Sequence, residues 1–173
     1  MILLAMDSPA ERLRLIGFLL QGISRGQGAV LACTQEGYEE LRRGLETLGA
    51  SSSDARLTRV VIRADVPATI QAIADANRLA ARRSGTVRLL ADFGRMIGKE
   101  SIFELEAALA SALEGLNAIH VTQYDGNVFD ASVTIEQFRS HALCIMGNAF
   151  YHENRNFTPP DRYLRKRAGG SQK

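Results

Sequence analysis

Long hydrophobic runs are missing from this sequence. No stretch approaches 18 consecutive apolar residues, so the chain offers no candidate for a membrane-spanning helix. The opening MILLAMDSPAE also lacks the basic start and the longer apolar run of a secretory signal. We therefore expect neither a secreted protein nor a membrane protein.

Cysteine and excess charge are scarce as well. The 2 cysteines, Cys33 and Cys144, cannot build a disulfide framework, which predicts a reduced, cytoplasmic protein. A formal net charge of +2 gives no general attraction to nucleic acid. What is present, 46% hydrophobic and 23% charged residues in a chain of 173, is typical of one globular domain with a sizeable core.

The 3 histidines show no spacing typical of a metal site, and there is no C-x-x-C motif, so we expect no metal. His141 and Cys144 could bind a metal only if other ligands converged on them. The alternative is a buried apolar thiol beside a histidine at a helix end. Nothing in the sequence fixes a Cys–His nucleophile pair, and Cys33 in the apolar run AVLAC reads as a core residue. No catalytic residue is assigned.

Short apolar segments alternate with helical patterns along the chain. Strands are expected at Ile2–Ala5, Ala29–Cys33, Leu57–Ile62, Val87–Ala91, Ile119–Tyr124 and Cys144–Phe150. Helices are expected from Pro9 to about Gly26, Tyr38 to Leu48, Val66 to about Arg83, Ser101 to Leu116, and Thr134 to Leu143. Asp65 is the expected N-cap of the third helix, and Gly49 and Gly85 are expected to end the second and third. Apolar strands separated by helices favour a three-layer α/β fold, with a mainly parallel sheet flanked by helices on both faces.

The turn after the first strand does not suit a nucleotide phosphate. It reads Asp7-Ser8-Pro9-Ala10-Glu11, without the glycines and the lysine of a phosphate loop. Pro9 has no N–H to donate, and the carboxylates of Asp7 and Glu11 would repel an anion. The glycine-rich stretch GISRGQGAV follows a helix and precedes a strand, which is the wrong order for a phosphate cradle. We expect no classical ATP hydrolysis at this junction.

The last third of the chain, TQYDGNVFDASVTIEQFRSHALCIMGNAFYHENRNFTPPDRYL, resembles the end of the MEDS domain, the methanogen/methylotroph and DcmR sensory domain. The matching residues are Gln123, Tyr124, Asp125, Phe129, His141, Glu153, Asn154, Phe157, Pro159 and Pro160. Earlier, ERLRLIGFLLQGISRGQGAVLAC and VRLLADFG are similar to the opening helix, turn and strands of that family. The resemblance spans nearly the whole chain.

This resemblance implies a RecA- or KaiC-like fold that has lost its phosphate loop. It implies a non-catalytic sensory module for small organic compounds, often fused to DNA-binding, histidine-kinase or anti-sigma modules. The chain departs from the family in having no histidine on its first strand and His141-Ala142 in place of an H-P dipeptide. We expect no output module after Leu164. Residues 1–164 are expected to form one sensory domain, with a basic, disordered tail at 165–173 that aids solubility rather than nucleic-acid binding.

Ligands of open parallel sheets bind beyond the carboxyl ends of the strands. The candidate ligand-binding residues at these positions and in the family-like segment are Asp7, Thr34, Asp92, Arg95, Tyr124, Asp125, His141 and Asn154. An ordinary strand exit at Tyr124 and Asp125, and a structural wrap at Asn154, are alternative interpretations. We expect a sensory or regulatory domain without cofactor, working through a protein partner and able to form a homo-oligomer. The alternatives are an ATPase-like enzyme with a non-standard loop, in which Asp92 would serve magnesium, and a ligand-free oligomeric scaffold.

Overall fold

The computed structural model describes residues 2–6, 9–49, 51, 53–93, 102–125, 139, 141–146, 150–159, 162 and 165. Its strands are β1 (Ile2–Met6), β2 (Gly28–Cys33), β3 (Leu57–Val61), β4 (Val87–Asp92), β5 (Ala118–Asp125), β6 (Leu143–Met146) and β7 (Phe150–Glu153). Its helices are α1 (Pro9–Ser24), α2 (Gln35–Thr47), α3 (Val66–Ser84) and α4 (Ile102–Ala112).

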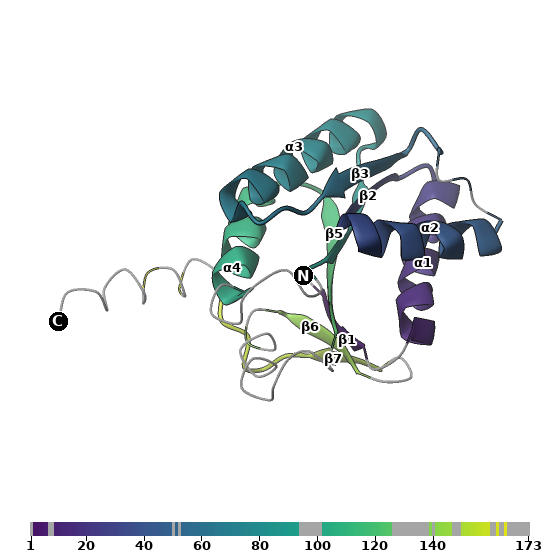
Figure 1. The fold of residues 1–173 in the computed structure, drawn as a ribbon. Coiled ribbons are helices and arrows are strands. Elements are labelled where there is room, and N and C mark those ends of the chain that lie inside the picture. The colour runs from purple at the N-terminus through teal and green to yellow at the C-terminus, as the bar shows by residue number, and fades with distance from the viewer. Residues whose placement is uncertain are drawn as a thin grey trace.

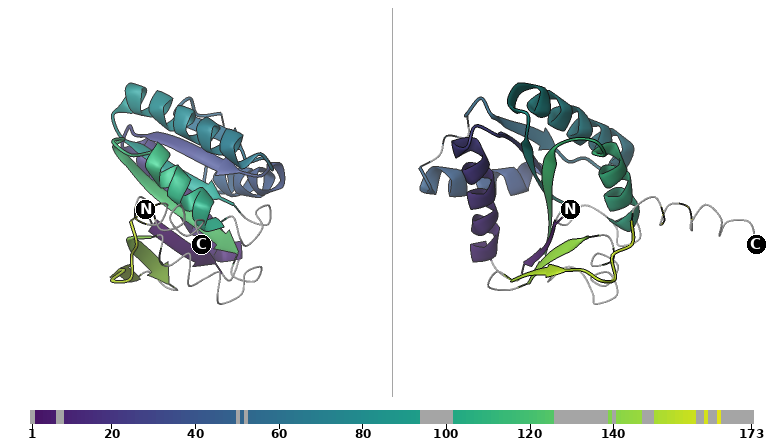
Figure 2. Two further views of the ribbon diagram at one scale, coloured as in Figure 1. Left: turned by 90° about the vertical axis from the view of Figure 1, so that its left-hand side faces the viewer. Right: turned by 180° about the vertical axis from the view of Figure 1, so that it is seen from behind.

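The strands form one seven-stranded sheet in the order β3-β2-β4-β5-β1-β6-β7 (Figure 1). The neighbouring pairs from β3 to β6 are parallel, and β7 runs antiparallel to β6. Helices α1 and α2 cover one face, and α3 and α4 cover the other (Figures 1 and 2). The expected three-layer α/β fold with a mainly parallel sheet is therefore confirmed.

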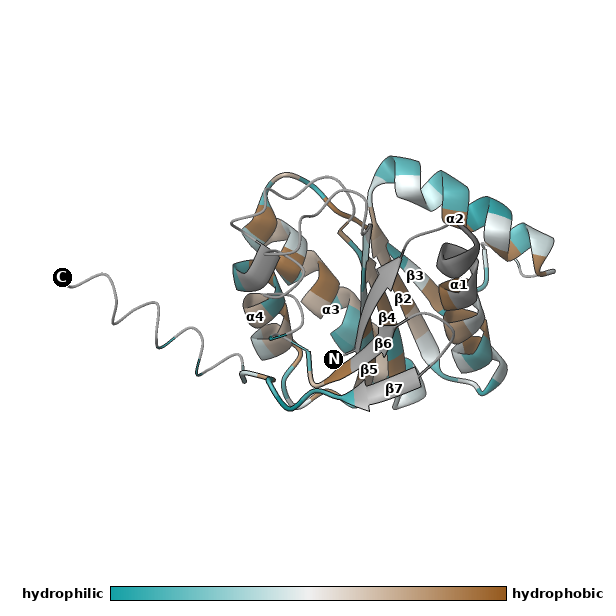
Figure 3. Cartoon of the chain, turned by 90° about the horizontal axis from the view of Figure 1, so that it is seen from below, coloured by the Kyte–Doolittle hydropathy of each residue, from teal (hydrophilic) through white to brown (hydrophobic). Residues whose placement is uncertain are grey.

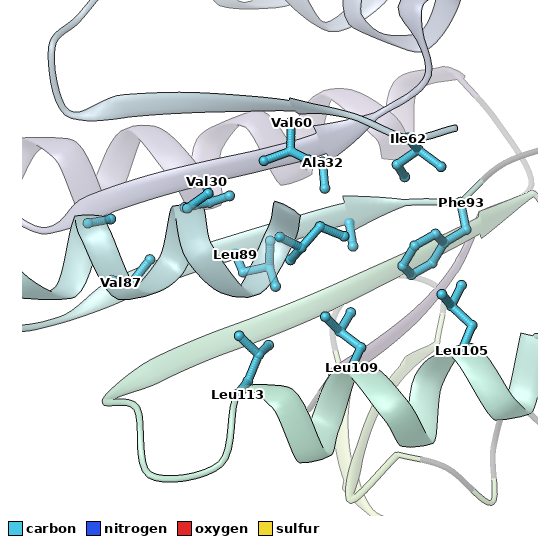
Figure 4. Packing of buried hydrophobic residues seen from close by; sticks show 14 of the residues in the cluster. Val30, Ala32, Val60, Ile62, Val87, Leu89, Phe93, Leu105, Leu109 and Leu113 are labelled. Atoms are coloured by element: carbon cyan, nitrogen blue, oxygen red, sulfur yellow. The ribbon is translucent and has the colours of Figure 1, made fainter. Parts of the chain in front are cut away.

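Each face of the sheet has its own hydrophobic core. On the α3/α4 face, Leu105, Leu109 and Leu113 are four residues apart, and all three point from the α4 side towards the strands (Figure 4). On the α1/α2 face, Leu41 and Leu45 repeat this spacing in α2, whose outer surface is hydrophilic (Figure 3). Full burial of each such side chain contributes about 1.5–3 kcal/mol, so the two faces together hold the sheet in place.

The expected ends of α3 are confirmed, whereas α2 begins at Gln35 rather than Tyr38 and α4 ends at Ala112 rather than Leu116. Asp65 Oδ1 accepts a hydrogen bond of 3.0 Å from the Ala68 N–H, which makes Asp65 the N-cap of α3. Gly85 ends the same helix with a φ of 75°, and Gly49 follows α2 with the same φ. Both glycines therefore take the left-handed conformation that other residues avoid.

The expected end of the chain needs correction. Leu143 does not end a helix but begins β6, and the expected strand Cys144–Phe150 is two strands, β6 and β7. A short run such as LCIM has no periodicity that separates helix from strand, and its pairing with β1 supplies the ladder that decides the outcome. Residues 134–138 and 140 of the expected helix, and residues 166–173 of the expected tail, lie outside the described residues.

No described helix has both the length and the apolar character needed to cross a membrane.

Candidate functional site

Three polar side chains line up near the carboxyl ends of β2, β4 and β5. The strand register pairs Cys33 with Asp92 and Asp92 with Gln123, so all three project from the same face of the sheet. That face is the α1/α2 face, since Cys33 belongs to its core cluster. Gln123 Nε2 donates to Asp92 Oδ2 at 3.1 Å, and both side chains are buried. We call Cys33, Asp92 and Gln123 the carboxyl-end row.

The Cys33 thiol in this row is unreactive at neutral pH. Burial, and secondarily the nearby Asp92, raise the pKa of Cys33 to about 12. The thiolate is the nucleophilic form, so at neutral pH almost none of the reactive species is present. The interpretation of Cys33 as a core residue is confirmed by its complete burial.

The carboxylate of Asp92 lies beside the first turn of α2. Thr34 caps this helix by accepting from the Gly37 N–H at 3.0 Å. A Cβ atom at Gly37 would lie 3.8 Å from Asp92 Oδ2, an ordinary van der Waals distance that places the carboxylate beside this turn, and 3.2 Å from Thr34 Oγ1, which is a tight contact. The positive end of the helix dipole favours the ionised form of a carboxylate placed there.

The carboxyl-end row lies at a topological switch point. Strands β2 and β4 are neighbours, yet β2 leads into α2 on one face and β4 precedes α4 on the other. Open α/β sheets commonly bind their ligands beyond the carboxyl ends of strands that diverge in this way. Asp92 at the end of β4 and Thr34 just after β2 flank this position.

A second polar cluster occupies the α3/α4 face, formed by Glu106, Tyr124 and His141. The Tyr124 hydroxyl donates to Glu106 Oε1, and His141 Nε2 lies 2.9 Å from Glu106 Oε2. Glu106 and His141 have no exposed surface, and Tyr124 has 1%. The His141–Glu106 contact has the distance of an ion pair without the alignment of a hydrogen bond. We call these three residues the buried triad.

Burial sets the protonation of the groups in and near the buried triad. Burial, and then the Glu106 carboxylate, raise the pKa of Tyr124 well above its usual value, so the phenol remains a hydrogen-bond donor. Burial, and then the nearby His141, hold the pKa of His120 well below its usual value. His120 is therefore neutral, and its Nε2 lies 3.1 Å from Thr122 Oγ1.

Asn154 connects the buried triad to the β6–β7 hairpin. Its Nδ2 donates to the His141 carbonyl at 2.8 Å, and its backbone N–H donates to the Ala142 carbonyl at 2.9 Å. The residues just before β6 are thereby bonded to the residue that follows β7. These bonds account for Asn154 as a structural residue and do not require a ligand.

The expected site residues that the structure describes do not form one group. Asp92 and Thr34 lie on the α1/α2 side near the α2 N-terminus, whereas Tyr124 and His141 meet Glu106 on the opposite face. Tyr124 is packed among core side chains, with its ring centroid 6.4 Å from that of Phe93.

The remaining site residues can be placed only in part. Asp125 is the last residue of β5, and Asp7 and Arg95 lie outside the described residues. Arg139 is helical and His141 lies shortly after it, with its imidazole buried against Glu106.

Three residues of these clusters were not among the expected site residues: Cys33, interpreted from the sequence as a core residue, Gln123 and Glu106. Gln123 precedes Tyr124 on β5, and strand alternation alone places it on the opposite face, beside Asp92. Glu106 follows Leu105 on α4, and the sequence left open whether it points inward or into solvent. The available signal was a carboxylate within the mostly apolar helix IFELEAALASA, because a charged group buried among apolar residues needs a partner.

Comparison with known proteins gives no matching family model and no matching curated protein. The resemblance to the MEDS domain therefore stays a prediction from the sequence.

Proposed function

We propose that the chain is a cytoplasmic, non-catalytic sensory or regulatory domain of the MEDS type, with a RecA/KaiC-like fold. It binds a small ligand beyond the carboxyl ends of β2, β4 and β5 and passes the change to a protein partner. A kinase, an anti-sigma protein or a DNA-binding protein would suit this role, and a homo-oligomer is compatible with it. The observation that carries the proposal is the Asp92 carboxylate, buried and oriented by Gln123 at the β2/β4 switch point.

The chemistry of the surrounding groups supports recognition over catalysis. Cys33 is held as a thiol by burial, and Thr34 Oγ1 accepts the bond that caps α2. Tyr124 is a buried donor to Glu106 on the other face of the sheet. These groups orient and bond one another, which favours a binding role over that of an activated nucleophile.

A hydrolysis assay separates this proposal from an ATPase-like enzyme. Purified protein is incubated with ATP and magnesium, and phosphate release is followed for the wild type and for Asp92→Ala. We expect no turnover above the protein-free rate in either sample. Robust turnover that Asp92→Ala abolishes would contradict the proposal, since Asp92 would then serve a metal–nucleotide complex.

A search for binding partners tests the proposal that the domain acts through another protein. The full chain is tagged and recovered from its native cells, and co-purifying proteins are identified by mass spectrometry. Reproducible recovery of one regulatory protein, with an affinity that changes when a ligand is added, is the expected result, because a ligand shifts an equilibrium only by differential affinity. Recovery of no reproducible partner would count against a regulatory role.

A further inference from the structure

Strand β3 bonds to a neighbour on one side only. It is an edge of the sheet and pairs with β2 among the described strands (Figure 1). The Ala29 N–H donates to the Arg56 carbonyl at 2.9 Å, and the Ile62 N–H donates to the Cys33 carbonyl at 2.9 Å. A parallel ladder bonds every second residue in this way. The even-numbered residues of β3 therefore face β2, and the odd-numbered residues turn their N–H and C=O groups away from it.

Two of the residues that face away have no backbone partner. The Leu57 N–H donates to the Asp54 carbonyl at 2.9 Å, whereas no described residue bonds the N–H or the C=O of Arg59 or Val61. Both residues are partly exposed, so solvent reaches them. We call the outward backbone groups of Arg59 and Val61 the β3 edge. It offers two N–H donors and two carbonyl acceptors at the spacing of a strand.

The charge along this edge is positive. Residues 56–63 hold three arginines, Arg56, Arg59 and Arg63, and no acid. The flanking Asp54 pairs with Arg56 at 2.8 Å, and the flanking Asp65 caps α3. Arg63 is exposed and forms no ion pair with a described residue. Its charge, like that of Arg59, is therefore available to an acidic partner.

Helix α2 holds Arg59 beside the edge. The guanidinium lies 3.7 Å from the centroid of the Tyr38 ring and also bonds to Gln35. Its Nε is buried and has no hydrogen-bond partner among the described residues. The strand register pairs Arg59 with Leu31, which belongs to the core of the α1/α2 face, so Arg59 lies on that face.

These charges favour a partner segment over a second copy of the chain. Pairing of two β3 strands would bring the arginines of both copies together along one seam, and like charges facing each other destabilise a strand pair. An extended acidic peptide is complementary in both respects. Its backbone supplies the missing donors and acceptors, and its carboxylates meet the arginines.

On the basis of the proposed function, whose output is a protein partner, we propose that the β3 edge binds an extended acidic segment of that partner as an additional strand. The backbone of the segment exchanges hydrogen bonds with Arg59 and Val61. Its side chains on the α1/α2 face are acidic and lie beside Arg59. In such strand addition the main-chain bonds supply affinity and alternate side chains supply specificity.

The first test uses the full chain and the peptide acetyl-TEVEVET-amide, with binding measured by calorimetry. We expect saturable binding, and at least about tenfold weaker binding of acetyl-TKVKVKT-amide, because like charges oppose pairing. Two further forms of the acidic peptide carry N-methyl groups, on the backbone nitrogens of either its glutamates or its valines. Alternate N–H groups of a strand point to opposite sides, so one form should bind at least about tenfold more weakly and the other as the parent does.

The second test changes the edge itself. Val61→Pro removes an N–H that faces away from β2, a position where an edge strand tolerates proline. Val61→Ala shortens the same side chain, keeps the N–H and is the matched control. Val61→Pro should weaken the acidic peptide by at least about tenfold, and Val61→Ala should leave its affinity unchanged. Arg63→Gln should also weaken binding, whereas Arg82→Gln, an exposed position near the end of α3, should not.

The peptide series on the wild type does not depend on the folding of any variant. Binding of both methylated forms as tightly as the parent would overturn the proposal, as would equal binding by Val61→Pro and Val61→Ala. Oligothymidylate binding as tight as that of the acidic peptide would also overturn it, since charge alone would then be recognised. Dimerisation of the wild type that Val61→Pro abolishes would make a second copy the occupant instead. Recovery of a ligand-dependent partner is measured independently, so the proposed function would stand after any of these results.

Discussion

His141 Nε2 lies 2.9 Å from Glu106 Oε2, and neither side chain is exposed to solvent. Glu106 comes from α4, and His141 lies immediately before β6, so the contact ties the C-terminal hairpin to the core of the α3/α4 face. Tyr124 completes the arrangement from β5 by donating to the other Glu106 oxygen. The stability of the hairpin should therefore depend on one carboxylate.

Replacing the Glu106 carboxylate tests how much it contributes to the stability of the fold. Glu106→Ala removes the partner of both Tyr124 and His141 in a buried place, and breaking a buried pair in this way costs about 3–5 kcal/mol. Glu106→Gln keeps the volume and an acceptor for Tyr124, so its cost should be smaller, about 1–2 kcal/mol. Denaturant unfolding measures both values. Glu114→Gln, an exposed position in the turn that follows α4, is the control and should change stability by no more than about 0.5 kcal/mol. Equal effects of Glu106→Ala and Glu114→Gln would contradict the structural role of the triad.

His120 should make the protein sensitive to acid. Its pKa in the folded chain lies well below the usual 6.5, so below pH 6.5 the unfolded chain binds a proton that the folded chain does not. The contribution of neutral His120 to the free energy of unfolding is therefore fully present above pH 6.5, and it falls by about 1.4 kcal/mol per pH unit below that pH. In unfolding curves from pH 7 to 5, His120→Gln should lose less stability than the wild type. Parallel pH profiles for the two proteins would argue against a buried neutral imidazole.

Cys33 should resist thiol reagents in the native state. Because its pKa is raised to about 12 and its side chain is completely buried, a maleimide or disulfide reagent at pH 8 meets neither an accessible thiol nor a thiolate. Peptide mapping by mass spectrometry should find Cys33 unmodified in native protein and modified in urea. Rapid labelling of Cys33 without denaturant would show that this part of β2 is open.

Two glycines of α1 should respond to alanine with opposite signs. Gly17 is exposed with open space around it, so Gly17→Ala should stabilise the protein by about 0.5–1 kcal/mol through helix propensity. A Cβ at Gly22 would lie 2.5 Å from Cδ of Arg88, which is buried and held by Gln27, among others. Gly22→Ala should therefore destabilise despite its better propensity, as thermal unfolding would measure. A stabilising Gly22→Ala would mean that Arg88 can move aside at little cost.

Much of the fold could be predicted because local signals and tertiary packing agree. The apolar runs of β2 and β4 are buried throughout, as strands of a parallel sheet covered on both faces must be. Asp65 and Gly85 mark the ends of α3 by chemistry that lies within a few residues of each boundary. These features require no knowledge of distant contacts.

The C-terminal hairpin could not be predicted in the same way. Strand β6 is four residues long and owes its state to pairing with β1, which is about 140 residues away in the sequence. Its apolar run is too short to carry a period, so a helix ending at Leu143 was equally compatible with the sequence.

The candidate site was predicted by position but not by face. The rule that ligands bind at the carboxyl ends of strands selected Asp92 and Tyr124. Both side chains are buried near the carboxyl-end edge of the sheet. Adjacent residues on a strand point in opposite directions, so Tyr124 joins Glu106 while Gln123 joins Asp92. Glu106 and Gln123 were missed because their significance arises from partners that only the folded chain brings together.

The most direct test of the account is a broad small-molecule screen by thermal shift on the wild type and Asp92→Asn, with Glu104→Gln as control. A ligand at 100 times its dissociation constant should raise the free energy of unfolding by about 2.7 kcal/mol. We predict at least one compound that does so in the wild type and in Glu104→Gln but not in Asp92→Asn. If no compound stabilises the wild type, or if every stabilising compound acts equally on Asp92→Asn, the claim that this domain recognises a small ligand at Asp92 is contradicted.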